Sequence, residues 1–190
     1  DSVNTIVTTV LNNVASNGST VTLTTGTDIK SATVFEAPAL ISMTGAAVQT
    51  LGSDDQLTGT GSADVLNATL NSAINVKPKL NGIETLNLST TATANIDLSS
   101  ATGVTAISHN ANVAGADLTV LNIAAIPTEL AVQNSVAGTD TLFQFQSAAL
   151  AGAADTVKLK LTANGVSTAA SGNINVAGLG AGVAETLDVT

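Results

Sequence analysis

Short stretches of alternating apolar and polar residues dominate the chain after Gly18. The segment STVTLTT (19–25) alternates with a period of two, and ANIDLSSATGVTAISHN (94–110) reads as strand, turn and strand. Period two places successive side chains on opposite faces of a strand, and Val, Ile and Thr favour strands. The pattern therefore predicts an all-β domain over residues 19–190.

Residues 1–18 have a different pattern. Their apolar side chains recur at helical spacing (Val3, Ile6, Val7, Val10, Leu11 and Val14), after Asp1 or Ser2 as N-cap and before Gly18. This spacing predicts one amphipathic helix over residues 3–16 within an N-terminal helix or linker, 1–18. The helix can link to or cap a neighbouring domain, or pack on its own domain, and the sequence leaves both open.

A loose repeat runs through the second half of the chain: an acidic residue, usually Thr, then alternating aliphatic residues. It begins at Glu84, Asp140, Asp155 and Glu185, and in relaxed form at Asp117, at intervals of 15 to 33 residues. One pattern at irregular intervals favours coils that each add a strand to a growing parallel sheet. We predict a parallel β-solenoid or β-helix with short irregular coils, and the alternative is an antiparallel β-sandwich.

Composition narrows the possible partners. Hydrophobic residues make up 44% of the chain and the mean hydropathy is +0.39, which excludes a wholly disordered chain. Ten Asp and four Glu against five Lys give a net charge of −9. Because so few cationic side chains could neutralise phosphates, we do not expect nucleic acid as a partner. Divalent cations are the partners that such an acidic surface favours. There is no cysteine, which excludes disulfides and cysteine-based zinc sites. No apolar run approaches the roughly 18 residues of a membrane span, so we expect no membrane insertion.

Two aspartates nine residues apart lie among glycines in LGSDDQLTGTGSADVLNATL (51–70). Asp55 precedes Leu57 by two residues, as Asp64 precedes Leu66. Calcium takes six to eight oxygen ligands from carboxylates, carbonyls and water, and a nine-residue repeat with Gly-rich turns and Asp-x-aliphatic supplies them. The spacing predicts a calcium site here; the alternative is that these aspartates only close turns through hydrogen bonds to the backbone.

The segments TVTLTTGTD (20–28), GSDDQLTGTGSADVLNATL (52–70) and KLNGIETLNLS (79–89) resemble the calcium-binding, repeats-in-toxin-type surface-layer proteins of Gram-negative bacteria. Related type I-secreted adhesins contain similar sequence segments. The resemblance covers residues 20–89. From 90 to 190 only the general pattern of short strands and turns is similar, and no defined motif is shared. After Asp28 the chain departs from the family pattern, so this resemblance leaves Asp28 a weaker candidate than the later aspartates.

The resemblance implies calcium ligands and a location. Transferred by motif, the implied metal ligands are Asp55, Asp64 and carbonyls near Gly52, Gly59 and Gly61, followed by Asp54, Asn67 and Asp28. It also implies an extracellular protein of the bacterial cell surface that folds on meeting calcium. Its implied partners are neighbouring copies in a surface lattice and lipopolysaccharide or another surface glycan.

No motif for catalysis is present, and we expect no enzymatic activity. The sequence has no His-Glu-x-x-His, phosphate loop or Gly-x-Ser-x-Gly. His109 lies in ISHNAN, which we interpret as an Asn-rich turn with an exposed histidine. The sequence thus predicts a structural, calcium-binding domain of a self-assembling surface-layer protein. The alternatives are a glycan- or host-binding module of a calcium-dependent adhesin, and a passive spacer.

Overall fold

The computed structural model describes residues 19–162, 172–179, 184 and 186–190. The helix expected over residues 3–16 lies outside the described residues. The described chain is almost entirely β-structure, with one four-residue 3₁₀ helix, η1 (Ser147–Leu150). None of its helical structure has the length and apolar character of a membrane span.

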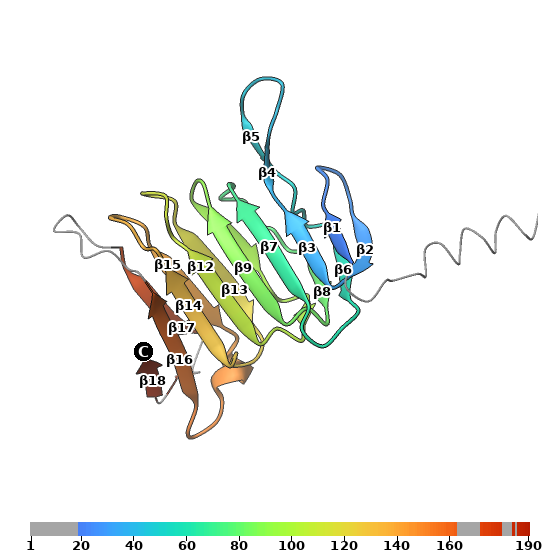
Figure 1. Cartoon of the computed structure of the whole chain (residues 1–190). Helices are drawn as coiled ribbons and strands as arrows, with labels where there is room; N and C mark the ends of the chain where they lie inside the picture. Colours follow the sequence, from blue (N-terminus) through green and yellow to red (C-terminus); the bar gives the residue numbers. More distant parts are fainter. Residues whose placement is uncertain (1–18, 163–171, 180–183, 185) are drawn as a thin grey trace, which may run out of the picture.

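Three parallel sheets contain most of the strands (Figure 1). The long sheet has the order β1 (Thr20–Thr22), β3 (Val34–Ala37), β7 (Val65–Leu70), β9 (Thr85–Thr90), β12 (Ala106–Asn110), β14 (Glu129–Gln133), β16 (Thr156–Thr162) and β18 (Thr186–Val189). The first short sheet has the order β11 (Ala101–Thr102), β8 (Lys79–Asn81), β6 (Gln56–Gly59) and β2 (Ile29–Ala32). The second short sheet has the order β10 (Ala94–Asp97), β13 (Leu118–Ile123), β15 (Thr141–Phe145) and β17 (Ile174–Gly178). Every strand pair in these three sheets is parallel, so the antiparallel sandwich is wrong for the described residues.

The chain alternates between the long sheet and a short sheet as it advances. Strands β2, β6, β8 and β11 each precede the next strand of the long sheet, and the second short sheet takes over this alternation from β10 onward. We call one passage from a strand of the long sheet to the next a coil. This winding is compatible with a parallel β-helix, because parallel neighbours require the chain to return to the same end of the sheet each time.

Coil length varies although the register of the long sheet does not. The same inward position of the long sheet is occupied in turn by Phe35, Leu66, Leu86, Ile107, Leu130 and Leu159. Successive members of this column are 31, 20, 21, 23 and 29 residues apart. The longest coil contains an extra antiparallel hairpin, β4 (Ala39–Ile41) and β5 (Ala47–Gln49).

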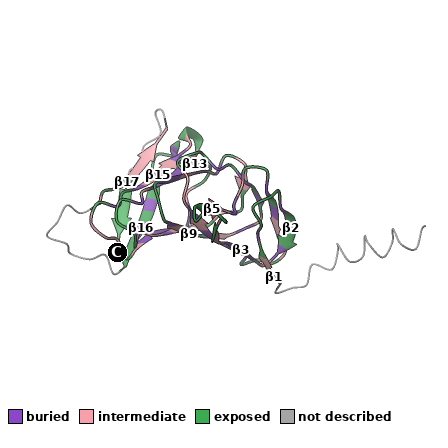
Figure 2. Ribbon diagram, turned by 90° about the horizontal axis from the view of Figure 1, so that it is seen from above, coloured by how far each residue is buried: buried purple, intermediate pink, exposed green. Residues whose placement is uncertain are grey.

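Burial follows the period-two pattern of the sequence. Strand β7 alternates half-buried and buried residues along its whole length, and Leu66 and Leu70 are fully buried. Buried positions run along the strands between the layers, and exposed ones gather at β2 and toward β16 and β18 (Figure 2). The three phenylalanines are fully buried among small aliphatic side chains. The interior between the sheets is thus filled mainly by small apolar side chains, as the composition of the chain predicts.

His109 lies inside the domain, and the prediction of an exposed histidine in a turn is wrong. It belongs to strand β12 and is fully buried. The alternation Ile107, His109, Ala111 explains this, because it places all three side chains on the inner face. A strand pattern therefore overrides the polar character of the ISHNAN stretch.

Candidate functional site

The predicted ligand residues lie in tight turns that lead into strands. Asp28 and Asp55 precede β2 and β6 of the first short sheet, and Asp64 precedes β7 of the long sheet. All three aspartates are buried, at 4%, 1% and 0% exposure, although they belong to turns. Buried carboxylates need hydrogen-bond partners, and the turns supply them.

A local hydrogen bond closes each turn. The Gly52 N–H donates to Asp55 Oδ2 at 2.7 Å, and the Gly61 N–H donates to Asp64 Oδ2 at 2.9 Å. The same bond joins the Gly152 N–H to Asp155 Oδ2 at 2.9 Å near the other end of the chain. In all three turns, the glycine three residues before the aspartate donates its N–H to the carboxylate of that aspartate and so closes the turn.

A second hydrogen bond joins turns of neighbouring coils. The Asp28 N–H donates to Asp55 Oδ1 at 2.8 Å across 27 residues. The Asp64 N–H donates to Glu84 Oε2 at 2.7 Å, and the Asp140 N–H to Asp117 Oδ1 at 2.8 Å. Acidic residues that precede strands thus stack from coil to coil.

This stacking explains the acidic repeat of the second half of the chain. Glu84 and Asp155 lead into strands of the long sheet, whereas Asp117 and Asp140 lead into the second short sheet. The repeat has irregular intervals because its members belong to two interleaved series of strands and because coil length varies. Glu185 lies outside the described residues.

The structure separates Asp55 from Asp64 and brings it together with Asp28. Strand β6 lies between Asp55 and Asp64, so the nine-residue interval places them in different turns. Asp55 instead meets Asp28, the candidate that the resemblance ranked last. Asp54, next to Asp55 in the chain, is exposed. Sequence reasoning missed Glu84 as the partner of Asp64; the signal was its position one coil later in the acidic repeat.

The remaining candidates have structural contacts of their own. Gly59 is packed so closely that an added Cβ would lie 1.8 Å from the Gly82 carbonyl oxygen and 2.2 Å from Asp64 Oδ2. Asn67 lies on β7 and its side-chain amide donates to Glu36 Oε1 at 2.7 Å. It belongs to a ladder of side chains on the long sheet, away from the turns.

The paired turns of Asp28 and Asp55 border a surface hollow. Its volume is about 200 Å³, and its lining residues are Thr25, Gly26, Thr27, Gly52, Ser53, Asp54 and Asp55. Burial raises the pKa of the Asp55 carboxyl, an effect that the N–H donors of Gly52 and Asp28 partly offset and that the nearby carboxylates of Asp28 and Asp54 reinforce. A second hollow beside it is lined by Asp54 and Asp55 together with Lys77 and Lys79.

The acidic side chains alone do not form a metal centre. Among the described residues there is no group of three His, Cys, Asp or Glu side chains that could hold a metal ion. An ion at the Asp28–Asp55 turns would therefore need main-chain carbonyls and hydroxyls of both loops beside the carboxylates. Carboxylate oxygens that accept one N–H keep lone pairs for a cation. The arrangement fits calcium, which accepts such mixed oxygen ligands.

No protein-family model, no curated protein and no solved structure matches the chain.

Proposed function

We propose that the chain is a β-solenoid that serves as a structural segment of a secreted, self-assembling bacterial surface-layer protein, and that calcium binds at its Asp28–Asp55 turns. The stacking of two turns from neighbouring coils, each ending in a buried aspartate, carries the proposal. The Asp28 N–H donates to Asp55 Oδ1 at 2.8 Å, and Asp55 lines one hollow together with Asp54 and the loop Thr25–Thr27 that precedes Asp28.

Because the carboxylates are buried, calcium is expected to stabilise the folded chain. The raised pKa of Asp55 reflects the cost of holding a charged carboxylate away from water beside two others. A divalent cation in the hollow would offset that repulsion in the folded chain only. Since the unfolded chain presents no assembled pair of turns, calcium should stabilise the fold by mass action.

The structural part of the proposal is supported by bonds that run along the coil axis. Glu36, Asn67, Asn87 and Ser108 occupy one register position of the long sheet. Their side chains are joined in sequence by hydrogen bonds of 2.7, 2.9 and 2.9 Å. Together with the stacked acidic turns, this ladder connects the coils on the outside while the apolar column connects them inside. Such a rod is suited to carrying load between neighbouring molecules.

Thermal unfolding with calcium and with chelator tests the calcium site. At a calcium concentration 100 times the dissociation constant, we expect stabilisation of about 2.7 kcal/mol. Asp55→Asn should remove most of that increment. Asp155→Asn, which alters a turn with the same local bond, should keep it.

Asp64→Asn distinguishes between the two predicted turns. If this variant and not Asp55→Asn loses the calcium increment, the ion binds at the Asp64–Glu84 turns. Equal midpoints of the unmodified chain in calcium and in chelator would reject the calcium site. The aspartates would then serve only to close and stack turns.

A further inference from the structure

The β4–β5 hairpin leaves the layers of the molecule and projects from them (Figure 1). Its base is fixed, because Thr50 Oγ1 donates to the Pro38 carbonyl at 2.8 Å and the Asn71 N–H donates to Gln49 Oε1 at 3.0 Å. Its tip is ordered by Ser42, whose N–H donates to the Ala46 carbonyl at 2.8 Å and whose Oγ accepts the Ala46 N–H at 3.1 Å. The hairpin is therefore a fixed projection.

The surface of this projection is apolar and uncharged. Ile41 is 71% exposed and Met43 fully exposed, and no Asp, Glu or Lys occurs between Glu36 and Asp54. Strands β4 and β5 pair only with each other among the described residues. An isolated two-stranded hairpin is marginally stable in water, and exposed apolar groups that gather in one place indicate an interaction site.

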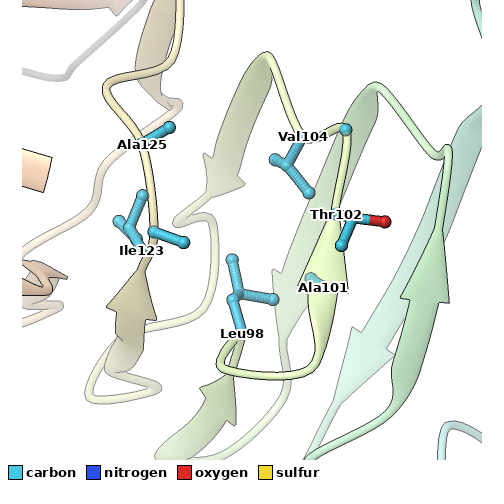
Figure 3. Close-up of a pocket in the computed structure, with 8 residues that line it drawn as sticks. Leu98, Ala101, Thr102, Val104, Ile123 and Ala125 are labelled. Atoms are coloured by element: carbon cyan, nitrogen blue, oxygen red, sulfur yellow. The ribbon is translucent and has the colours of Figure 1, made fainter.

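A matching hollow lies elsewhere on the same molecule. Its volume is about 190 Å³, and it is lined by Leu98, Ala101, Thr102, Gly103, Val104, Ile123, Ala124 and Ala125 (Figure 3). We call it the notch. It lies beside the outer edge of β11, the last strand of the first short sheet. None of the residues that line it is charged, and the nearest acidic residue along the chain is Asp97, which precedes Leu98.

Size and charge make the two features complementary. An apolar cavity of ~150 Å³ in another protein accepts benzene, so the notch has room for a side chain such as Met43. Each copy carries a net charge of −9, so two copies repel through most of their surfaces. Contact between the uncharged hairpin and the uncharged lining of the notch keeps most charged side chains of the two copies apart and so reduces that repulsion.

We propose that the hairpin tip of one copy inserts Met43 into the notch of a second copy, with Ile41 packed at its rim. The two surfaces are different parts of the chain, so the contact is head-to-tail, and each copy keeps a free hairpin or a free notch for the next one. This inference deepens the self-assembly part of the proposed function and does not depend on calcium.

Complementation between two variants tests the contact. In sedimentation velocity, the unmodified chain should associate with rising concentration. Met43→Asp and Ala125→Glu should each weaken that association roughly tenfold to a hundredfold, the loss expected from failing to bury one large apolar side chain. An equimolar mixture should form heterodimers, because one variant keeps a working notch and the other a working hairpin.

Ile74→Asp is the matched control for a charge added to an exposed apolar residue. Ile74 is 78% exposed and lies outside both the hairpin and the notch. This variant should associate like the unmodified chain. An effect as large as that of Met43→Asp would show that added charge, rather than the hairpin, controls association.

Cysteine cross-linking tests the same contact directly, since the chain has no cysteine of its own. A mixture of the Met43→Cys and Ala125→Cys chains should form a disulfide-linked dimer under mild oxidation. A mixture of the Ile74→Cys and Ala125→Cys chains should not. An unmodified chain that stays monomeric at millimolar concentration, or a variant mixture that stays monomeric, would overturn the proposal.

Measuring the calcium increment on the monomeric Met43→Asp chain separates the two proposals. If the increment remains, the calcium site stands whether or not the hairpin docks. If docking occurs and the increment is absent, only the calcium site fails.

Discussion

Gly59 shows how closely neighbouring coils approach at the acidic turns. A methyl group at this position would overlap the Gly82 carbonyl oxygen and the Asp64 carboxylate. The atom that this methyl group would meet first is a backbone carbonyl oxygen, which cannot rotate away as the end of a flexible side chain can. Gly61 is also confined, since its added Cβ would lie 2.9 Å from Asp64 Oδ1, so close packing favours glycine at both positions of the Asp64 turn.

Gly59→Ala should therefore be strongly destabilising. Overpacking against backbone costs about 1–3 kcal/mol or more, measured as a lower urea midpoint at constant slope. Gly26→Ala is the control, because its added Cβ would meet only Thr24 Oγ1 at 3.8 Å. Equal midpoints for the two variants would mean that the coils can move apart at this turn.

His109 is held as a neutral ring by two threonine hydroxyls. Thr90 Oγ1 donates to the Ala116 carbonyl, so it can only accept from His109 Nε2, 3.0 Å away. Nδ1 therefore accepts the hydroxyl proton of Thr141 at 2.7 Å. Burial lowers the pKa of His109 from 6.5 to about 4.

The lowered pKa predicts a loss of stability in mild acid. The unfolded chain binds the proton near pH 6.5 and the folded chain only near pH 4, so stability contributed by His109 is present above pH 6.5 and declines as the pH falls to about 4. A shift of this size corresponds to roughly 3 kcal/mol. Urea unfolding of the unmodified chain at pH 7 and pH 4.5 should show most of this loss.

His109→Gln is the comparison for the acid measurement, because an amide can bond to both hydroxyls without titrating. Its stability should change much less between pH 7 and pH 4.5. An equal acid loss in both chains would assign the effect to the carboxylates instead.

At the scale of elements, the side-chain ladder on the outside of the long sheet makes its own contribution. Asn87 stands in the middle of it, donating to Asn67 Oδ1 and accepting from Ser108 Oγ, both at 2.9 Å. Asn87→Ala should remove both bonds and lower the free energy of unfolding by about 1–2 kcal/mol. Gln56→Ala serves as the control, since this exposed side chain on β6 has no hydrogen bond among the described contacts.

Equal urea midpoints for the Asn87→Ala and Gln56→Ala chains would contradict this role of the ladder. Water would then satisfy Asn67 and Ser108 as well as Asn87 does, and the coils would be connected by the backbone and the apolar column alone.

Strands were predictable from the sequence wherever one face meets the core. Residues 94–110 and the acidic repeat show period two because alternate side chains enter the apolar interior. The β4–β5 hairpin gave no such signal, because neither of its faces packs on the core. The partner of Asp55 could not be predicted either: it is set by coil length, and the hairpin lengthens that coil. Asp28 thus lies 27 residues from Asp55, whereas Glu84 lies 20 from Asp64.

At the scale of the whole molecule, the stacking of coils predicts uneven stability along the chain. Strands β9 and β12 have parallel neighbours on both sides, whereas β1 and β18 each have one neighbour in the described part of the long sheet. All four residues of β18 are exposed, and those of β9 are mostly buried or half-buried. In stacked arrays each unit is stabilised by its immediate neighbours, so the ends should open more readily than the middle.

Hydrogen exchange followed by mass spectrometry measures this gradient. Peptides from β9 and β12 should exchange slowest, and those from β18 and the β4–β5 hairpin fastest, with rates that differ roughly a hundredfold or more. Exchange of the hairpin peptides should slow when the chain is concentrated enough to associate, because docking in the notch would protect the hairpin. The Met43→Asp chain should show no such change. Uniform protection along the long sheet would mean that all coils open together, and the nearest-neighbour account of this fold would be wrong.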